Sequence, residues 1–593
     1  MSSTLSKFDT IINTLLSTIK RFPLASLSAF LLTTILMVLV NNHYNTPNEI
    51  IASKVAFVST LAFVLFTALR LLSYRNIFYI VGVILIVGYY YILPANIDHA
   101  SKYIFTRHIL LMLAFLFMII WSPFVGKNSD NATFWQWTQG VLFSIITAIF
   151  FGLVVWASSV GAMYAVKTLF HFDIDSVRYA QVGIFSLGLV STLYFLSQIP
   201  KHPLFLEVRP YSKAKRTFAK LILGTIAVIY FIILYSYSAK ILLTHSWPSG
   251  TVSWIIVAFT FVVIIGFLFW TPFLNKKSTL LQRFIWLAIL LQTIMLGMAL
   301  YMRVMEYGIT YNRYLIGMYG IWLALMSIYF ILFGKAQQKW LFFFASVFIL
   351  VSQFGPYSAK NITQKSQEQR LMKLIKEAQP LSEETNMKTK YQISDVIAYI
   401  NQNYGTESFK RTLPEIYKRF EENSKKEHEI QEDGSHIYFY NFPYFATNEL
   451  GFKFVNRWDW ISYKNPKKRE RYFYAKRDKS AIDITGYNYL ILYNTYSMAS
   501  KEENSTTIDI EKNLLTVNQG RESLSKFKLD SFIEKLAHKQ INELGNIDRE
   551  ELIFEAEDNA TRVKLLFSNI VLNGEKEILN ANYQALIKVK KRQ

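Results

Sequence analysis

The sequence predicts a polytopic α-helical membrane bundle of about 11 transmembrane helices, followed by a soluble α+β domain with a mainly antiparallel sheet. Of the 593 residues, 52% are hydrophobic. The long apolar runs fall almost entirely in residues 1–355, whereas 356–593 have the composition of a soluble domain. From residue 436 onward the apolar spacing changes from helical to alternating, which is typical of half-buried strands.

A helix needs roughly 20 mostly apolar residues to cross the hydrocarbon core. Eleven runs meet this requirement, and the fifth is long enough to tilt. They cover residues 22–40, 52–72, 76–94, 104–125, 137–166, 177–199, 217–243, 252–274, 281–304, 314–334 and 338–354.

The first run resembles a signal peptide, but polar residues rather than a small-residue cleavage site follow it, at Asn41, Asn42 and His43. We therefore expect it to be a retained helix. In the preceding stretch, Leu5, Phe8, Ile12, Leu15 and Ile19 recur at helical spacing. This pattern predicts an amphipathic helix over residues 1–21 at the cytoplasmic interface.

The loops orient the bundle, because basic residues are retained on the cytoplasmic side. With the N-terminus inside, 17 of the 25 Lys and Arg residues of 1–355 fall inside and 8 fall outside. An odd number of spans then places residues 356–593 outside the cytoplasm. The expected location is the bacterial inner membrane, with a cytoplasmic N-terminus and a periplasmic C-terminal domain.

The net charge of +21 divides into +17 for residues 1–355 and +4 for 356–593. Because the excess lies in short loops between apolar runs and not on a soluble basic face, we expect no nucleic-acid partner. The absence of cysteine excludes disulfides, thiol catalysis and thiolate metal sites. The chain also lacks P-loop, G-x-S-x-G, H-E-x-x-H and Rossmann motifs, so we expect no cofactor.

We predict four parts: a cytoplasmic interfacial helix (1–21), the transmembrane domain (22–355), a connecting helix (356–380) and the extracytoplasmic domain (381–593). The connecting helix packs either near the headgroups or on its own domain. Ser394 is the expected N-cap of a helix ending before Gly405, and a second helix over 407–423 contains Pro414 as a kink or break.

Alternating residues from Phe452 to Trp460 predict a strand. A helix near 527–541 and turns at Gly520 and Asn573-Gly574 complete the expected soluble domain. Further predicted strands cover 436–440, 471–477, 481–494, 505–517, 551–556, 561–571 and 582–590.

Several segments resemble a family of bacterial integral membrane proteins known only as domain of unknown function 4153. The resemblance implies a multi-span envelope protein and supplies no catalytic residues. It rests on Ala239-Lys240-Ile241-Leu242, Trp247-Pro248-Ser249-Gly250, Ser253-Trp254, Glu306-Tyr307-Gly308-Ile309-Thr310, Asn312-Arg313-Tyr314, Phe354-Gly355-Pro356-Tyr357-Ser358-Ala359, Ser366-Gln367 and, more weakly, residues 484–490.

The candidate site residues are Arg303, Glu306, Asn312 and Arg313, between the ninth and tenth spans. In one interpretation they form a polar pocket at the outer rim that grips an anionic headgroup or a peptide. In the other they form a salt-bridged, hydrogen-bonded turn in which Gly308 supplies an unusual backbone angle.

Other charged residues of the spans, including Arg107, Lys167 and Lys240, lie near span ends, where basic side chains can snorkel. The lack of a central charge argues against a proton-coupled pump. His428, Glu429, Glu432, Asp433 and His436 are either metal ligands or a solvated loop, and we favour the loop and expect no metal.

A non-catalytic envelope scaffold or partner-binding protein is the favoured role, with the lipid bilayer and another envelope protein as partners. The first alternative is a transporter or flippase of a small molecule or lipid. The second is a membrane-embedded transferase using a lipid-linked donor, for which Asp173 and Asp175 are the best acidic residues.

Overall fold

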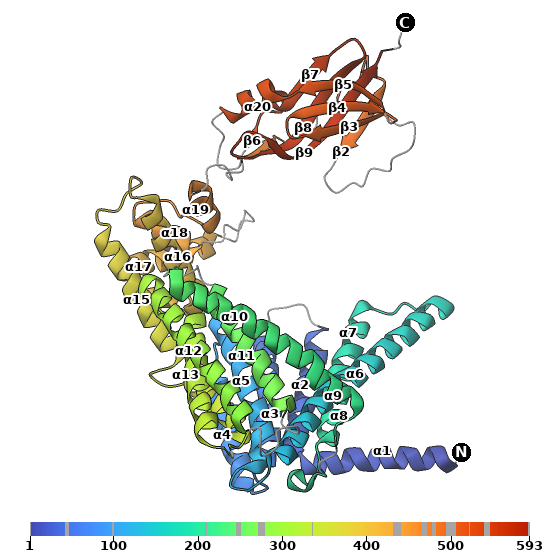
Figure 1. The fold of residues 1–593 in the computed structure, drawn as a ribbon. Coiled ribbons are helices and arrows are strands. Elements are labelled where there is room, and N and C mark those ends of the chain that lie inside the picture. The colour runs from blue at the N-terminus through green and yellow to red at the C-terminus, as the bar shows by residue number, and fades with distance from the viewer. Residues whose placement is uncertain are drawn as a thin grey trace. The chain divides into compact units, whose positions relative to one another are not determined.

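The computed structural model divides into two compact units, the first of Met1–Glu377 with Val396–Phe442 and the second of Ala378–Asp395 with Pro443–Gln593 (Figure 1). The predicted four-part division stays a prediction. The residues that the structure describes are 2–41, 47–97, 100–207, 210–244, 251–270, 279–334, 336–430, 441–464, 471–476, 482–493, 506–520, 522–538 and 546–590.

The first unit is helical throughout its described residues. Two helices contain a π-helical segment, Phe185–Val190 between α7 and α8 and Phe218–Leu223 between α9 and α10. The helices are α1 (Ser2–Arg21), α2 (Pro23–Leu39), α3 (Pro47–Leu72), α4 (Asn76–Ile92), α5 (Lys102–Trp121), α6 (Asn131–Phe170), α7 (Ser176–Ile184), α8 (Ser191–Gln198), α9 (Lys213–Thr217), α10 (Gly224–Thr244), α11 (Thr251–Trp270), α12 (Thr279–Tyr307), α13 (Tyr311–Leu332), α14 (Lys339–Gln353), α15 (Ala359–Glu377), α16 (Met387–Tyr404) and α17 (Pro414–Ile430).

Among the described residues, eight helices are long and apolar enough to cross a membrane, or nine if the bent pair Ile12–Arg21 and Pro23–Leu39 counts as one span. The helix axis bends by 108° between the two parts of that pair. Two further apolar helices are shorter, with 17 residues in α4 and 15 in α14. The prediction of a helical membrane bundle is therefore confirmed, whereas the number of 11 spans is not.

Two buried apolar clusters hold the bundle together. One contains side chains of all the helices from α10 through α14, and in it the rings of Trp286 and Phe330 stack with their centroids 4.5 Å apart. The other joins α2, α3, α5, α6 and α8 around Phe22 and Trp137. Lipid tails are as apolar as these side chains, so close packing rather than transfer from water stabilises such contacts in a bilayer.

At one end of the bundle, hydrogen bonds between side chains and backbone groups connect the ends of several helices. The Arg21 guanidinium donates to the carbonyls of Ile199 and Pro200, and the Arg70 guanidinium donates to the carbonyl of Arg21. Elsewhere at this end, the ammonium of Lys339 donates to the carbonyls of Phe124 and Lys127, and the Asn131 side chain bonds Ala336 and Gln338.

The other ends of these helices meet as a second group. Tyr103 at the start of α5 packs with Tyr311 at the start of α13 and Ala359 at the start of α15. The Tyr311 hydroxyl donates to Gln353 at the end of α14 (3.0 Å). The ends of α5, α13, α14 and α15 therefore lie together.

The second unit contains two sheets that share one core. The six-stranded sheet has the order β2-β9-β8-β1-β6, with β7 also paired to β8, and the other sheet is β3-β4-β5. All pairs are antiparallel except β1 with β6, which confirms the predicted mainly antiparallel sheet. The elements are β1 (Arg471–Ala475), β2 (Tyr489–Tyr493), β3 (Thr506–Glu511), β4 (Leu514–Gln519), β5 (Glu522–Lys528), α20 (Asp530–Ala537), β6 (Asn546–Ile547), β7 (Ile553–Glu557), β8 (Thr561–Leu572) and β9 (Ile578–Val589).

Two local predictions are wrong because polar caps override the apolar pattern. Ser394 lies inside α16, where its hydroxyl accepts from the Val455 N–H, while Asn386 accepts from the Lys388 N–H at the true start. The predicted strand over 452–460 instead contains the start of helix α19 (Arg457–Lys464). Asn456 and Asp459 cap this helix reciprocally.

Other boundaries also differ. The predicted helix 407–423 is broken at Pro414, which was one of the two alternatives: a 3₁₀ helix covers Thr406–Lys410 and Pro414 begins α17, since the first helical position needs no N–H. The predicted strand 505–517 is the hairpin of β3 and β4. The predicted turns hold, because Gly520 (φ +60°) follows β4 and Asn573 precedes β9. The predicted strand 436–440 lies outside the described residues.

Substitution of Ile587 tests the core of the second unit. This β9 side chain is fully buried, so Ile587→Ala should lower the free energy of unfolding by about 2–5 kcal/mol. Its exposed neighbour provides the control, and Lys588→Ala should change stability by less than about 0.5 kcal/mol. Urea unfolding of the full chain in detergent measures both, and equal losses would contradict the assigned register.

Candidate functional site

The predicted polar residues meet around the ring of Tyr307, where α12 ends and α13 begins. The guanidinium carbons of Arg303 and Arg313 lie 5.7 and 5.3 Å from the ring centroid. Arg370 of α15 approaches the same ring at 5.6 Å, although sequence reasoning did not include it. The structure therefore brings three cations onto one aromatic ring.

Glu306 and Asn312 are both exposed. The Glu306 carboxylate interacts with the Tyr307 hydroxyl. Within the described part of the chain, Glu306 forms no ion pair with either Arg303 or Arg313. The cluster therefore carries excess positive charge.

The backbone of the turn is held by α15. Gly308 has φ +68° and its carbonyl accepts from the Arg313 guanidinium at 2.9 Å. The Gln367 amide donates to the carbonyls of Tyr307 and Ile309 at 3.0 and 3.1 Å. The Ser366 hydroxyl accepts from the Ile309 N–H. The turn is thus hydrogen-bonded as one interpretation predicts, while its role as a ligand pocket stays a prediction.

A second cationic cluster, which sequence reasoning missed, surrounds Arg107 of α5. Arg107 is only 6% exposed, and its Nε has no hydrogen-bond partner. Its guanidinium carbon lies 5.4 and 5.2 Å from the ring centroids of Tyr89 and Tyr103, and the group also interacts with their hydroxyls. The prediction that Arg107 snorkels is wrong, because neighbouring helices enclose it.

The neighbour of Arg107 in the chain, His108, has both ring nitrogens occupied. Nε2 lies 2.8 Å from the Thr60 hydroxyl, and Nδ1 lies 3.1 Å from the Tyr89 hydroxyl. Its ring also packs on Phe57 at 3.8 Å. With two neutral partners and a cation next to it, His108 is a structural part of this end of the bundle.

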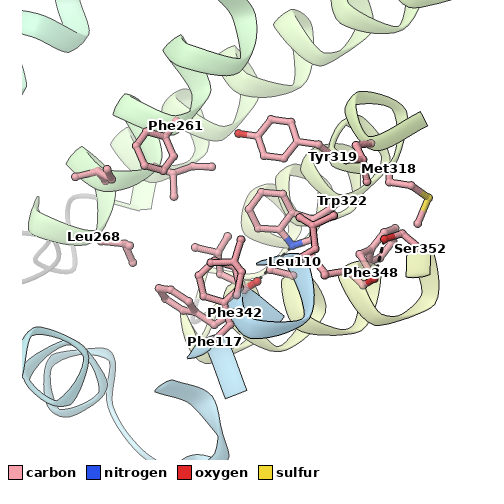
Figure 2. Close-up of a pocket in the computed structure, with 17 residues that line it drawn as sticks. Leu110, Phe117, Phe261, Leu268, Met318, Tyr319, Trp322, Phe342, Phe348 and Ser352 are labelled. Atoms are coloured by element: carbon pink, nitrogen blue, oxygen red, sulfur yellow. Dashed lines mark hydrogen bonds between the residues drawn. The ribbon is translucent and has the colours of Figure 1, made fainter. Parts of the chain in front are cut away.

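An apolar cavity of about 380 Å³ lies between α5, α11, α13 and α14 (Figure 2). Its few polar groups are satisfied by protein. The Tyr319 hydroxyl bonds Thr260, and the indole N–H of Trp322 donates to the Leu341 carbonyl. The lining residues are Leu110, Leu113, Phe117, Phe261, Ile264, Ile265, Leu268, Leu315, Met318, Tyr319, Trp322, Leu341, Phe342, Ala345, Phe348, Ile349 and Ser352.

The remaining candidates do not assemble into a catalytic site. The Asp173 carboxylate is 97% exposed and pairs with Lys167 at 3.4 Å. Asp175 precedes α7 without a side-chain cap bond. The side chains of His428, Glu429, Glu432, Asp433 and His436 lie outside the described residues. Among the side chains that the structure describes, no group of three or more His, Asp or Glu could hold a metal ion.

The sequence model described as "Domain of unknown function (DUF4153)" matches residues 28–378, which is more than half of the chain. The chain belongs to the DUF4153 family. The matched region runs from α2 to the end of α15 and contains both cationic clusters and the cavity, so these are features of the DUF4153 region. No curated protein and no solved structure matches the chain.

Replacement of Gly308 tests the turn. A Cβ at this position would lie 2.9 Å from Nε2 of Gln367, and φ +68° is strained for other residues. Gly308→Ala should therefore destabilise the protein by more than about 1 kcal/mol. Gly297 of α12 has nothing within 4 Å of such a Cβ, so Gly297→Ala is the control and should be neutral or stabilising. Thermal unfolding in detergent compares them, and equal melting temperatures would refute the strain.

Proposed function

We propose that this DUF4153 protein is a non-catalytic binding or scaffold protein of the bacterial inner membrane, with 11 spans, a cytoplasmic N-terminus and its second unit outside the cytoplasm. The observation that carries the role is the apolar interior of the bundle, whose cavity is lined almost entirely by hydrocarbon side chains. Gln292, the most central polar side chain of α12, is 1% exposed and accepts from the Ser238 hydroxyl at 3.3 Å. Neither Gln292 nor Glu306 lines the cavity.

The span number rests on adding two short helices to the nine apolar candidates. At 1.5 Å per residue, α4 and α14 are roughly 25 and 22 Å long, somewhat less than the roughly 30 Å core. A bilayer adapts to such a mismatch at modest cost. Both helices are apolar and join neighbours at both ends of the bundle, which supports their counting as spans.

The grouping of helix ends supports the orientation. Arg21, Arg70 and Lys339 lie together at the end that also contains the basic loops around Lys127 and Lys201. The positive-inside rule makes this end cytoplasmic. The opposite end, with Tyr103, Tyr311 and the start of α15, is then the outer one.

A transporter would need a polar path or titratable groups inside the bundle. Buried lysines instead donate to carbonyls at helix ends, as Lys54 does to Leu93 and Lys339 does to Phe124. The transferase alternative loses support because its acid Asp173 is paired and fully exposed. Binding therefore fits the described residues better than transport or catalysis.

Cysteine accessibility tests the topology, since the chain contains no cysteine of its own. In spheroplasts, a membrane-impermeant maleimide should label Asp173→Cys and Lys588→Cys, whereas Lys201→Cys should react only after permeabilisation. All three positions are exposed. If only Lys201→Cys were labelled, the orientation would be the opposite of the one proposed. If Asp173→Cys were labelled and Lys588→Cys were protected, the number of spans would be even and not odd.

Reconstitution tests the role. Proteoliposomes containing the full chain should scramble a fluorescent phospholipid no faster than protein-free vesicles, because the bundle offers no polar path for a headgroup. A known scramblase reconstituted in parallel serves as the positive control. Protein-dependent scrambling would contradict a non-transporting role and favour the flippase alternative.

A further inference from the structure

The unpaired charge of Arg107 is the most unusual feature of the outer end of the bundle. A buried cation is stable when an anion or several acceptors compensate it. Across the described residues, Arg107 forms no ion pair, and its Nε lacks any partner. Tyr89 and Tyr103 offer partial compensation through their ring faces and their hydroxyls. The site therefore lacks one negative group.

A second cation shares this site. The Lys360 ammonium lies 5.9 Å from the centroid of the Tyr103 ring, which Arg107 also approaches at 5.2 Å. Partial desolvation lowers the pKa of Lys360, repulsion from Arg107 lowers it further, and attraction from Glu407 opposes both. Glu407 itself pairs with Lys410 at 3.6 Å. Both cations therefore lie against the same ring, that of Tyr103.

Helix ends strengthen the positive potential. The N-termini of α5, α13 and α15 meet here, where Tyr103, Tyr311 and Ala359 form one buried cluster. Each N-terminus carries the positive end of a helix dipole, while the Tyr311 N–H donates to the Tyr399 hydroxyl and the Asn361 N–H to the Ser358 hydroxyl. Three such ends beside Arg107 and Lys360 favour a phosphate.

The apolar cavity begins one helical turn from this charge. Leu110, Leu113 and Phe117 of α5 line it, and Arg107 precedes them on the same face at i−3. Tyr311 likewise precedes Leu315 and Met318 on one face of α13, at i−4 and i−7. Residues of α5 and α13 therefore lead continuously from the cationic cluster into the cavity.

The cavity has the properties of a site for a hydrocarbon chain. Its volume of about 380 Å³ is within the range of ligand pockets, about 300–1,000 Å³. Leu113 and Phe261, which line it, are 37% and 60% exposed, so the cavity is not filled by protein side chains. Figure 2 shows apolar side chains of all four helices directed toward this space.

We propose that the bundle binds one anionic phospholipid, with its phosphate between Arg107 and Lys360 and one acyl chain in the cavity. An acyl chain in the bilayer is already in apolar surroundings, so the cavity positions the lipid without supplying much transfer free energy. Selectivity must then come from the charge-assisted hydrogen bonds of the buried guanidinium. The inference goes beyond the proposed function and requires only that the bundle lies in a bilayer.

Native mass spectrometry of the full, delipidated chain in detergent tests the proposal. Phosphatidylglycerol should bind about tenfold or more tightly than phosphatidylcholine, because only the former carries a net negative headgroup. Arg107→Gln and Lys360→Gln should remove this preference by weakening phosphatidylglycerol binding more than phosphatidylcholine binding. Ala345→Phe, which fills the cavity, should weaken both lipids. Lys167→Gln is the control for a lysine elsewhere and should leave the preference intact.

Several outcomes would overturn the proposal. Equal binding of the two lipids by the unmodified chain would do so, as would an unchanged preference in Lys360→Gln, which alters an exposed residue and spares the fold. Displacement of phosphatidylglycerol by millimolar inorganic phosphate would identify a free-anion site instead. Arg107→Lys keeps the positive charge and should retain most of the preference for phosphatidylglycerol. This variant therefore still tests the role of the charge if Arg107→Gln does not fold. Scrambling results bear on the proposed function alone.

Discussion

The hydrocarbon core of a bilayer tolerates few unsatisfied polar groups, and the helical unit is organised around this constraint. Many of its buried polar side chains bond carbonyls or hydroxyls of their own or neighbouring helices, whereas Ser26, Ser186, Trp286 and Ser327 each keep a buried polar atom without a hydrogen-bond partner among the residues that the structure describes. Gln292 meets Ser238, Thr260 meets Tyr319, and Lys54 and Lys339 reach carbonyls at helix ends. A bundle with so few charged groups in its interior has little to offer a polar substrate inside it.

Charge is correspondingly confined to the two ends of the bundle. At one end, basic side chains close the loops by bonding carbonyls, as Arg21 does with Ile199 and Pro200. At the other end, cations gather on aromatic rings, around Tyr307 in one cluster and Tyr103 in the other. Arg107 differs from all of these because it is buried and incompletely satisfied. This difference is why an anionic ligand is inferred at Arg107.

The sequence predicted the features that depend on composition and local signals. Apolar runs predicted the bundle, and Gly520 and Asn573 predicted turns between strands. The Glu306–Arg313 segment predicted a polar cluster, which the structure partly assembles. Features that depend on distant contacts were missed. Ser394 looked like a cap because its partner Val455 is 61 positions away. The capping pair Asn456 and Asp459 is a local signal, and it was missed because it lies within an alternating apolar pattern.

The cluster around Arg107 was also missed because it depends on contacts between residues that are distant in the sequence. Arg107 looked like an ordinary span-end residue, and only the fold brings Tyr89, Tyr311 and Lys360 around it. One signal was present in the sequence, since Arg107, Leu110, Leu113 and Phe117 share a helical face. Without knowledge of which helix covers that face, the pattern fits lipid exposure equally well.

The most direct test is a cryo-electron microscopy map of the full chain in nanodiscs that contain phosphatidylglycerol. The account predicts headgroup density against the Arg107 guanidinium that continues as a chain between α5 and α11. An empty cavity with the Arg107 side chain turned outward into the headgroup layer would contradict it.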